Sequence, residues 1–246
     1  MLALTNEPLR AHTWFETGGP ATAWLEPATD EELADALYNA CQERQAVCVL
    51  GDGANVLVSD DGFDGCVIHP ANTCIGVTGT RGDSRVLVTA GAGALIDDLI
   101  EWSLQQGLTG LEQFSGIPGT VGGAVYINVH YFEALLADVM HSARITSADG
   151  NESNEVMADW FEFGYDTSRL HEGTHYVAAA TFALEQADER TAAFARGRRH
   201  EIVGTVSAAT RRRGPAAVSS ATSCLTRSTS KSTAQRSCTW RTISTR

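Results

Sequence analysis

The sequence lacks several patterns by which common ligand sites are recognised. No two of its six cysteines are spaced as CxxC, which argues against a zinc site, and their scatter argues against a disulfide framework. No segment matches GxxxxGK[ST], so a P-loop is excluded. No apolar run approaches the roughly 20 residues that cross a bilayer, and no signal-peptide pattern is found at the start. These absences predict reduced thiols, several of them in the core, in a cytoplasmic protein.

Basic residues are also few. The chain of 246 residues has 18 lysines and arginines against 30 acidic residues, so its formal net charge is -12. A negatively charged surface repels the phosphate backbones of nucleic acids and anionic lipid headgroups. We therefore expect neither nucleic acid nor a membrane among its partners.

Acidic residues are absent from the last part of the chain. Glu201 is the last of them, and residues 202–246 are rich in serine, threonine and arginine without helical or strand periodicity. Such a segment buries too little apolar surface to offset the entropy of ordering its backbone, so residues 201–246 are expected to form a disordered basic tail. Two interpretations stay open: an interaction arm, or a segment translated in a shifted reading frame.

The remaining sequence predicts two lobes that mix strands and helices. Lobe 1, residues 1–70, has a β-α-β pattern whose helix begins at Thr29, with Glu32 completing a capping box. Lobe 2, residues 71–200, alternates strands with an amphipathic helix. The strands are expected at residues 23–25, 47–50, 56–58, 85–90, 144–146 and 177–184, and the second helix at residues 95–107.

Three glycine-containing loops are candidate ligand sites. They are Gly51–Asn55, Gly91–Ala94 and the region from Gly110 to Gly123. Glycine permits positive φ and close approach of a ligand, and successive backbone N–H groups can hold a diphosphate. The second loop follows a strand as a Rossmann loop does, but Ile96 stands where the third glycine belongs. Any one of these loops alone is more often an ordinary turn.

The order of these loops resembles one enzyme family. Residues 13–21 resemble its TTFRxGGPA opening, residues 50–57 its LGxGSNxL loop, and residues 91–93 a GAG element. Residues 107–112 and 115–124 match GLxGLE…GIPGTVGGA, the most specific element, and residues 163–168 resemble FGYRxS. The chain from about residue 10 to 186 thus resembles the UDP-N-acetylenolpyruvoylglucosamine reductases (UDP-N-acetylmuramate dehydrogenases).

This resemblance implies an α+β fold: a two-lobed FAD-binding domain of the vanillyl-alcohol-oxidase (PCMH) type, with FAD between the lobes. It implies that NADPH reduces FAD, which then reduces the enolpyruvyl double bond of a UDP-sugar in peptidoglycan synthesis. The family's third, substrate-binding domain is expected to be missing here. The cofactor-binding residues that the resemblance implies are Gly51, Asp52, Gly53, Ala54, Asn55, Val56, Gly116, Ile117, Pro118, Gly119, Thr120, Gly122, Gly123 and Asn128.

The sequence departs from the family where the substrate binds. Asp166 occupies the position of the arginine in FGYRxS, where a carboxylate would repel the substrate carboxylate. Arg169 is a possible substitute, and Tyr165 is either a substrate contact or a packing aromatic. The segment with the family's serine proton donor is replaced by residues 217–223. Two other interpretations therefore remain: another FAD-linked oxidase of the same fold, or an inactive, truncated FAD-binding remnant.

Overall fold

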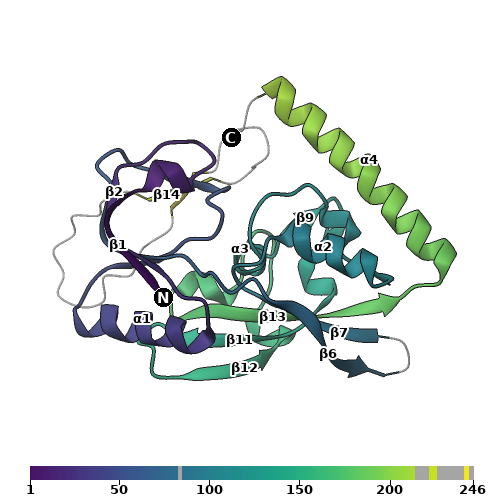
Figure 1. Cartoon of the computed structure of the whole chain (residues 1–246), viewed down its shortest axis with the longest axis horizontal. Coiled ribbons are helices and arrows are strands. Elements are labelled where there is room, and N and C mark those ends of the chain that lie inside the picture. Colours follow the sequence, from purple (N-terminus) through teal and green to yellow (C-terminus); the bar gives the residue numbers. More distant parts are fainter. Residues whose placement is uncertain (83–84, 214–221, 226–240, 244–246) are drawn as a thin grey trace.

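The computed structural model describes residues 1–82, 85–213, 222–225 and 241–243. Lobe 1 contains a four-stranded sheet with helix α1 (Asp30–Gln42) beside it (Figure 1). The first two strands of this sheet pair antiparallel and its other pairs are parallel. The sheet order is β1 (Leu2–Pro8), β2 (Pro20–Glu26), β5 (Phe63–Ile68), β3 (Val47–Val49).

Helix α1 begins at the predicted cap. Thr29 Oγ1 accepts a hydrogen bond from Glu32 N at 3.2 Å, and the predicted apolar face is buried. In a capping box the Glu32 side chain would accept a hydrogen bond from Thr29 N. Here Glu32 Oε2 accepts from the preceding residue instead, Ala28 N, at 2.8 Å. The buried face packs on β5 and on Ala178 of the other lobe, so the two lobes share part of their core.

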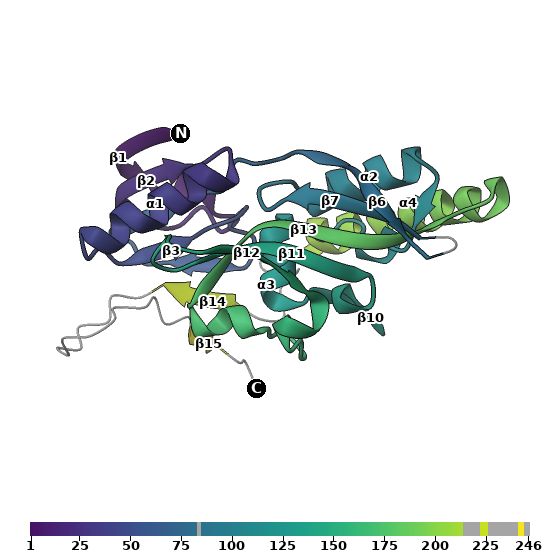
Figure 2. The same cartoon turned by 90° about the horizontal axis from the view of Figure 1, so that it is seen from below.

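Lobe 2 contains a larger antiparallel sheet with helices α2 (Ile96–Gln105) and α3 (Val121–Ile127) on one face (Figures 1 and 2). Its central strand, β13 (His175–Gln186), is buried over the predicted residues 177–184 because both of its faces are covered. The other strands of this sheet are β6 (Ile75–Arg81), β7 (Arg85–Gly91), β8 (Leu108–Thr109), β11 (Met140–Ser147) and β12 (Ser153–Met157).

Short elements connect these strands. Strands β9 (His130–Tyr131) and β10 (Ala134–Leu135) form a small hairpin after α3. Five 3₁₀ turns complete the connections: Leu9–His12, Glu112–Phe114, Leu136–Asp138, Ala158–Phe161 and Arg169–Glu172. Several cysteines were expected in the core, and Cys48 and Cys66 are buried, whereas Cys41 and Cys74 are exposed.

The last helix differs from the predicted tail. Helix α4 (Glu189–Arg213) continues past Glu201, so residues 201–213 are helical. Its first half is anchored by buried Ala192 and Ala195, and the helix extends from there away from the sheet (Figure 1). Strand β14 (Thr222–Leu225) pairs with β4 (Val56–Val58) and with β15 (Arg241–Ile243). Most of the segment proposed to be frameshifted lies outside the described residues, and so does Cys238. No helix in the described part of the chain is both long and apolar enough to span a membrane.

Arg199 joins α4 to α2. Its guanidinium binds both carboxylate oxygens of Asp97, at 2.6 and 3.0 Å, and Glu101 at 2.9 Å. Hydrogen bonds from Arg199 lower the pKa of the Asp97 carboxyl below its ordinary value of 3.8. Asp97 also accepts a hydrogen bond from Gly116 N at 3.3 Å. The cluster therefore links α4 to the glycine-rich region next to the cleft described below.

We expect Arg199→Met to lower the free energy of unfolding at pH 7 by about 1 to 2 kcal/mol, because it breaks a fork-shaped ion pair that is only partly exposed. A carboxyl whose folded pKa is lowered stabilises the protein above its unfolded pKa. The difference between variant and wild type should therefore shrink as the pH falls below about 3.8. Urea unfolding at pH 7 and near pH 3 measures this. Arg196→Met, on an exposed face of the same helix, is the control. A pH-independent difference would contradict the assignment.

Candidate functional site

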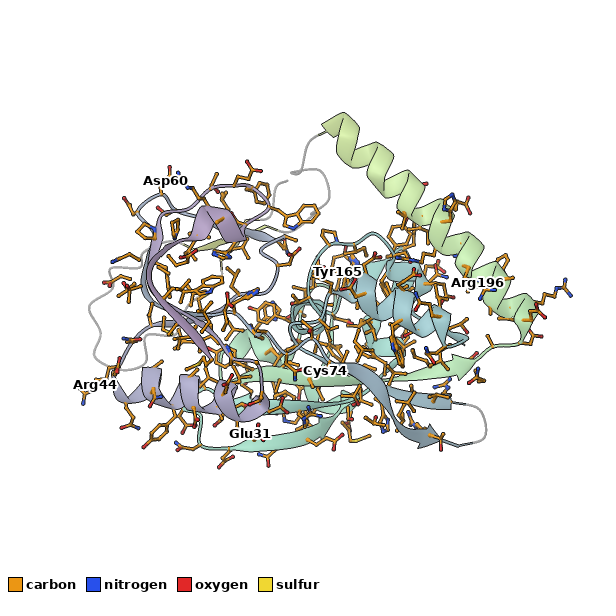
Figure 3. All side chains as sticks on the ribbon, in the orientation of Figure 1. Glu31, Arg44, Asp60, Cys74, Tyr165 and Arg196 are labelled. Atoms are coloured by element: carbon orange, nitrogen blue, oxygen red, sulfur yellow. The ribbon has the colours of Figure 1, made fainter. Side chains whose placement is uncertain are left out.

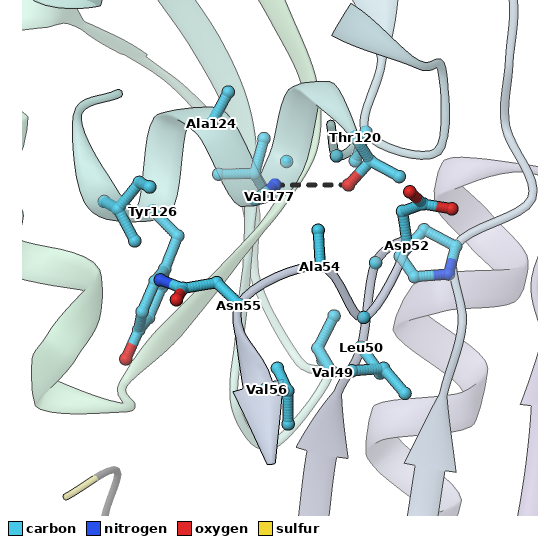
Figure 4. A pocket seen from close by; sticks show the side chains of 18 of the residues that line it. Val49, Leu50, Asp52, Ala54, Asn55, Val56, Thr120, Ala124, Tyr126 and Val177 are labelled. Atoms are coloured by element: carbon cyan, nitrogen blue, oxygen red, sulfur yellow. Dashed lines mark hydrogen bonds between the residues drawn. The ribbon is translucent and has the colours of Figure 1, made fainter. Parts of the chain in front are cut away.

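A cleft runs between the two lobes and encloses about 1310 Å³ of empty space, part of it open to solvent. One wall is the loop between β3 and β4, and the other is the segment from Ile117 through the first turn of α3. Figure 4 shows Asp52 and Ala54 of the first wall facing Thr120 of the second. The rest of the lining is largely apolar, which suits a flat aromatic ligand.

The loop of the first wall is supported from behind. Leu50 is buried and its backbone is hydrogen-bonded to Ile68 O and to the His69 ring. Gly53 has φ +65°, and a Cβ there would lie 2.1 Å from His12 O. Trp14 N donates to Gly53 O at 3.3 Å. The loop therefore has little freedom to move away from the cleft.

Four consecutive backbone donors are available in this loop. The N–H groups of Gly51, Asp52, Gly53 and Ala54 donate to no acceptor among the described residues. Among the residues that the structure describes, no lysine or arginine lines the cleft. Backbone N–H groups in such a turn form a concave site for an anion. The site therefore fits a diphosphate bound through the main chain, as the sequence predicted for an acidic chain.

The second wall is built on the N-terminus of α3. Thr120 Oγ1 accepts from Gly123 N at 3.3 Å and caps the helix. Gly122 N donates to Ala92 O at 2.9 Å, which places the Gly91–Ala94 loop behind this wall. The two walls approach each other closely at Gly51, where an added Cβ would lie 2.4 Å from Thr120 Oγ1.

Most of the predicted cofactor-binding residues lie in this cleft. Those that line it are Gly51, Asp52, Gly53, Ala54, Asn55, Val56, Ile117, Pro118, Gly119, Thr120, Gly122 and Gly123. Gly116 and Asn128 do not line it. Gly116 N binds Asp97, and the buried side chain of Asn128 donates to Gly164 O and accepts from Ala137 N, both at 3.0 Å.

Several apolar residues of the lining were missed from the sequence. They come from the end of α3, the turn before β13 and β13 itself: Ile127, Val129, Leu170, Tyr176 and Val177. Their only sequence signal is apolar character, which equally indicates core. Their place in the cleft depends on pairing between distant strands.

The predicted substrate residues lie outside the cleft lining, on lobe 2. Tyr165 is exposed (Figure 3), and its ring centroid lies 4.4 Å from that of His130. His130 Nε2 lies 3.6 Å from the carboxylate of Asp166, a neighbour that the sequence analysis did not identify. Arg169 is paired with Glu162 and lies over the ring of Trp160, 5.1 Å from its centroid. The guanidinium is therefore already engaged within lobe 2.

Comparison with known proteins agrees with this geometry. Residues 21–153 match the model of the FAD binding domain family. The chain is 38% identical over 181 residues to a UDP-N-acetylenolpyruvoylglucosamine reductase of Latilactobacillus sakei, covering 73% of this chain and 57% of that protein. This chain belongs to the FAD binding domain family. Within the residues that align, it is similar to UDP-N-acetylenolpyruvoylglucosamine reductases.

Solved structures share the fold of this chain. The crystal structure of the UDP-N-acetylenolpyruvylglucosamine reductase from Thermus caldophilus superposes with a TM-score of 0.66 at 27% identity, covering 85% of this chain and 69% of that one. The 6-hydroxy-D-nicotine oxidase of Arthrobacter nicotinovorans shares the fold at 15% identity, with a TM-score of 0.57 and coverage of 75% and 42%. The predicted α+β FAD-binding fold of the PCMH type is thus confirmed. The chain spans only about half of the length of several curated relatives, 49% in Treponema denticola.

Proposed function

We propose that this chain forms the FAD-binding part of an FAD-dependent, NADPH-linked reductase that converts UDP-N-acetylglucosamine enolpyruvate to UDP-N-acetylmuramate. The matched relatives are named as UDP-N-acetylenolpyruvoylglucosamine reductases, which supports this reaction. We place the step in cytoplasmic peptidoglycan synthesis, as the sequence resemblance implies. The observation that supports it best is a row of four N–H groups, from Gly51 to Ala54, that have no acceptor among the described residues. They lie in a cleft whose described lining contains no lysine or arginine.

In this proposal each part of the cleft has a separate task. The N–H groups from Gly51 to Ala54 hold the diphosphate, and the capped first turn of α3 closes the opposite side. The apolar lining, including Ile117 and Val177, excludes water from the ring system. The bound flavin supplies hydride transfer, which no side chain of the protein can provide.

The substrate end of the site supports a narrower proposal for this chain. By the sequence resemblance, Asp166 takes the place of an arginine that would bind an enolpyruvyl carboxylate, and its carboxylate lies 3.6 Å from His130 Nε2. The guanidinium of Arg169 is engaged by Glu162 and Trp160. We therefore propose that FAD binding is retained and that turnover of the UDP-sugar by the described residues is weak. Consumption of NADPH with and without the UDP-sugar measures this turnover.

FAD is expected to bind at least about 100-fold more tightly than FMN, because FMN has no diphosphate to occupy the four N–H groups, and 100-fold corresponds to about 2.7 kcal/mol. Titration of each flavin, followed by fluorescence quenching and by the melting temperature of the protein, gives both affinities. ADP should compete with FAD, because it carries the same diphosphate. Equal affinity for the two flavins, or no competition by ADP, would contradict the proposed site. Oxygen-dependent oxidation of an alcohol without reduction of the UDP-sugar would instead indicate an oxidase.

A further inference from the structure

The segment from His12 to Trp14 lies directly behind the loop that is proposed to hold the FAD diphosphate. It meets the loop at three points. His12 O occupies the space that a Cβ on Gly53 would need, and Trp14 N donates to Gly53 O at 3.3 Å. The indole Nε1 of Trp14 donates to Asp52 Oδ2 at 2.8 Å. Thr13, between these two residues, is buried and its hydroxyl donates to Thr17 O at 2.9 Å, which fixes the segment itself.

Asp52 presents an electrostatic problem for this site. Among the described residues that line the cleft it is the only acidic one, and it lies within the row of four N–H groups that would bind an anion. Figure 4 shows its side chain on the side of the loop that faces Thr120. A carboxylate free to turn toward a diphosphate would weaken binding by like-charge repulsion. The position of this carboxylate therefore affects the affinity of the site.

Trp14 is suited to control that position. Its side chain is 38% exposed and is not part of the buried core clusters, so core packing does not explain its place. Its ring nitrogen can only donate, and the acceptor that it uses is Asp52. The hydrogen bond joins residues 38 positions apart and ties the front of the loop to the supporting segment.

We propose that Trp14 is a positioning residue for FAD binding. Its indole N–H holds the Asp52 carboxylate in place and offsets part of its charge. This inference rests on the proposed function, since it concerns the same diphosphate site. It adds a specific residue outside the cleft and explains how an acidic residue is accommodated inside it.

The experiment is a double-mutant cycle on FAD affinity. Trp14→Phe keeps an aromatic ring and removes the donor, and we expect the Kd for FAD to rise about fivefold, the equivalent of about 1 kcal/mol. Asp52→Asn in the Trp14→Phe background removes the charge and should restore the affinity to within about twofold of wild type. The loss in Trp14→Phe should also decrease as salt rises, because repulsion is screened. Thermal unfolding without FAD should be nearly unchanged in both variants.

Trp102→Phe is the matched control, because Trp102 packs against the core of lobe 2 and does not line the cleft. It should leave the Kd unchanged. If wild type binds FAD and Trp14→Phe binds it equally well, the positioning role is wrong and the proposed function stands. A loss that Asp52→Asn does not relieve would overturn the electrostatic role of the bond. If wild type itself fails to bind FAD, the proposed function is wrong.

Discussion

Replacement of Gly53 by alanine is expected to lower FAD affinity at least about 100-fold and the free energy of unfolding by about 2 to 4 kcal/mol. Gly53 has φ +65°, and its Cβ would lie 2.1 Å from His12 O and 2.9 Å from Thr13 Cα. Both obstacles are backbone atoms, so the loop itself has to move. That movement would displace the neighbouring N–H groups that are proposed to hold the diphosphate.

Alanine variants of two other glycines distinguish the cost of backbone strain at positive φ from the cost of steric overlap between the new Cβ and His12 O. Gly82→Ala lies outside the cleft lining, at φ +60° with no described atom within 4 Å of the new Cβ, and should show only the backbone strain. Gly76→Ala in β6 also meets open space, has no positive φ, and should be nearly neutral for both stability and affinity. Flavin titration and urea unfolding of the three variants give the comparison. Equal effects of Gly53→Ala and Gly82→Ala on stability would show that the contact with His12 O does not matter.

Elements with a strong local pattern could be predicted from the sequence. The cap at Thr29 and the apolar spacing after it locate α1 and its buried face. The apolar run from Val177 to Leu184 locates the centre of β13. The two walls of the cleft were predicted through the family resemblance that the order of the glycine loops carries, since each loop alone is more often an ordinary turn.

Elements that depend on distant partners could not be predicted in this way. Strand β1 is mostly exposed and owes its conformation to pairing with β2. Helix α3 was hidden in a glycine-rich region: Gly122 and Gly123 lie in its first turn, where they weaken helix propensity, and the Thr120 cap and tertiary contacts compensate. Residues 201–213 have no clear hydrophobic periodicity, but they continue a helix whose first half is anchored by the buried side chains of Ala192 and Ala195.

The same limit applies to individual residues of the site. The order of the loops predicts that Asp52 lies at the cofactor, but not that Trp14 would bind its carboxylate. The position of Asn128 after the glycines suggests a ligand contact, whereas its side chain binds backbone groups 36 and 9 residues away. Side-chain partners at such separations follow from the folded topology and not from local spacing.

Replacement of Asn128 by alanine is the second large effect that we expect, a loss of about 3 to 4 kcal/mol in the free energy of unfolding. Asn128 is 1% exposed, ends α3 at φ +49°, and binds both Gly164 O and Ala137 N. Alanine would leave both backbone groups without their partner and would tolerate the left-handed conformation poorly. Asn128→Gly relieves only the conformational part, so it should be more stable than the alanine variant by about 1 kcal/mol.

The loss at Asn128 should extend to the segment that carries Tyr165 and Asp166. That segment is tied to α3 at two points, by Asn128 to Gly164 O and by Ser168 Oγ to Tyr126 O at 2.7 Å. Hydrogen exchange at residues 163–168 should therefore increase in Asn128→Ala, together with the fall in stability measured by urea unfolding. Asn154→Ala, at an exposed position of β12, is the control for loss of an amide. If Asn128→Ala were as stable as this control, Asn128 would be free to act as a ligand contact instead.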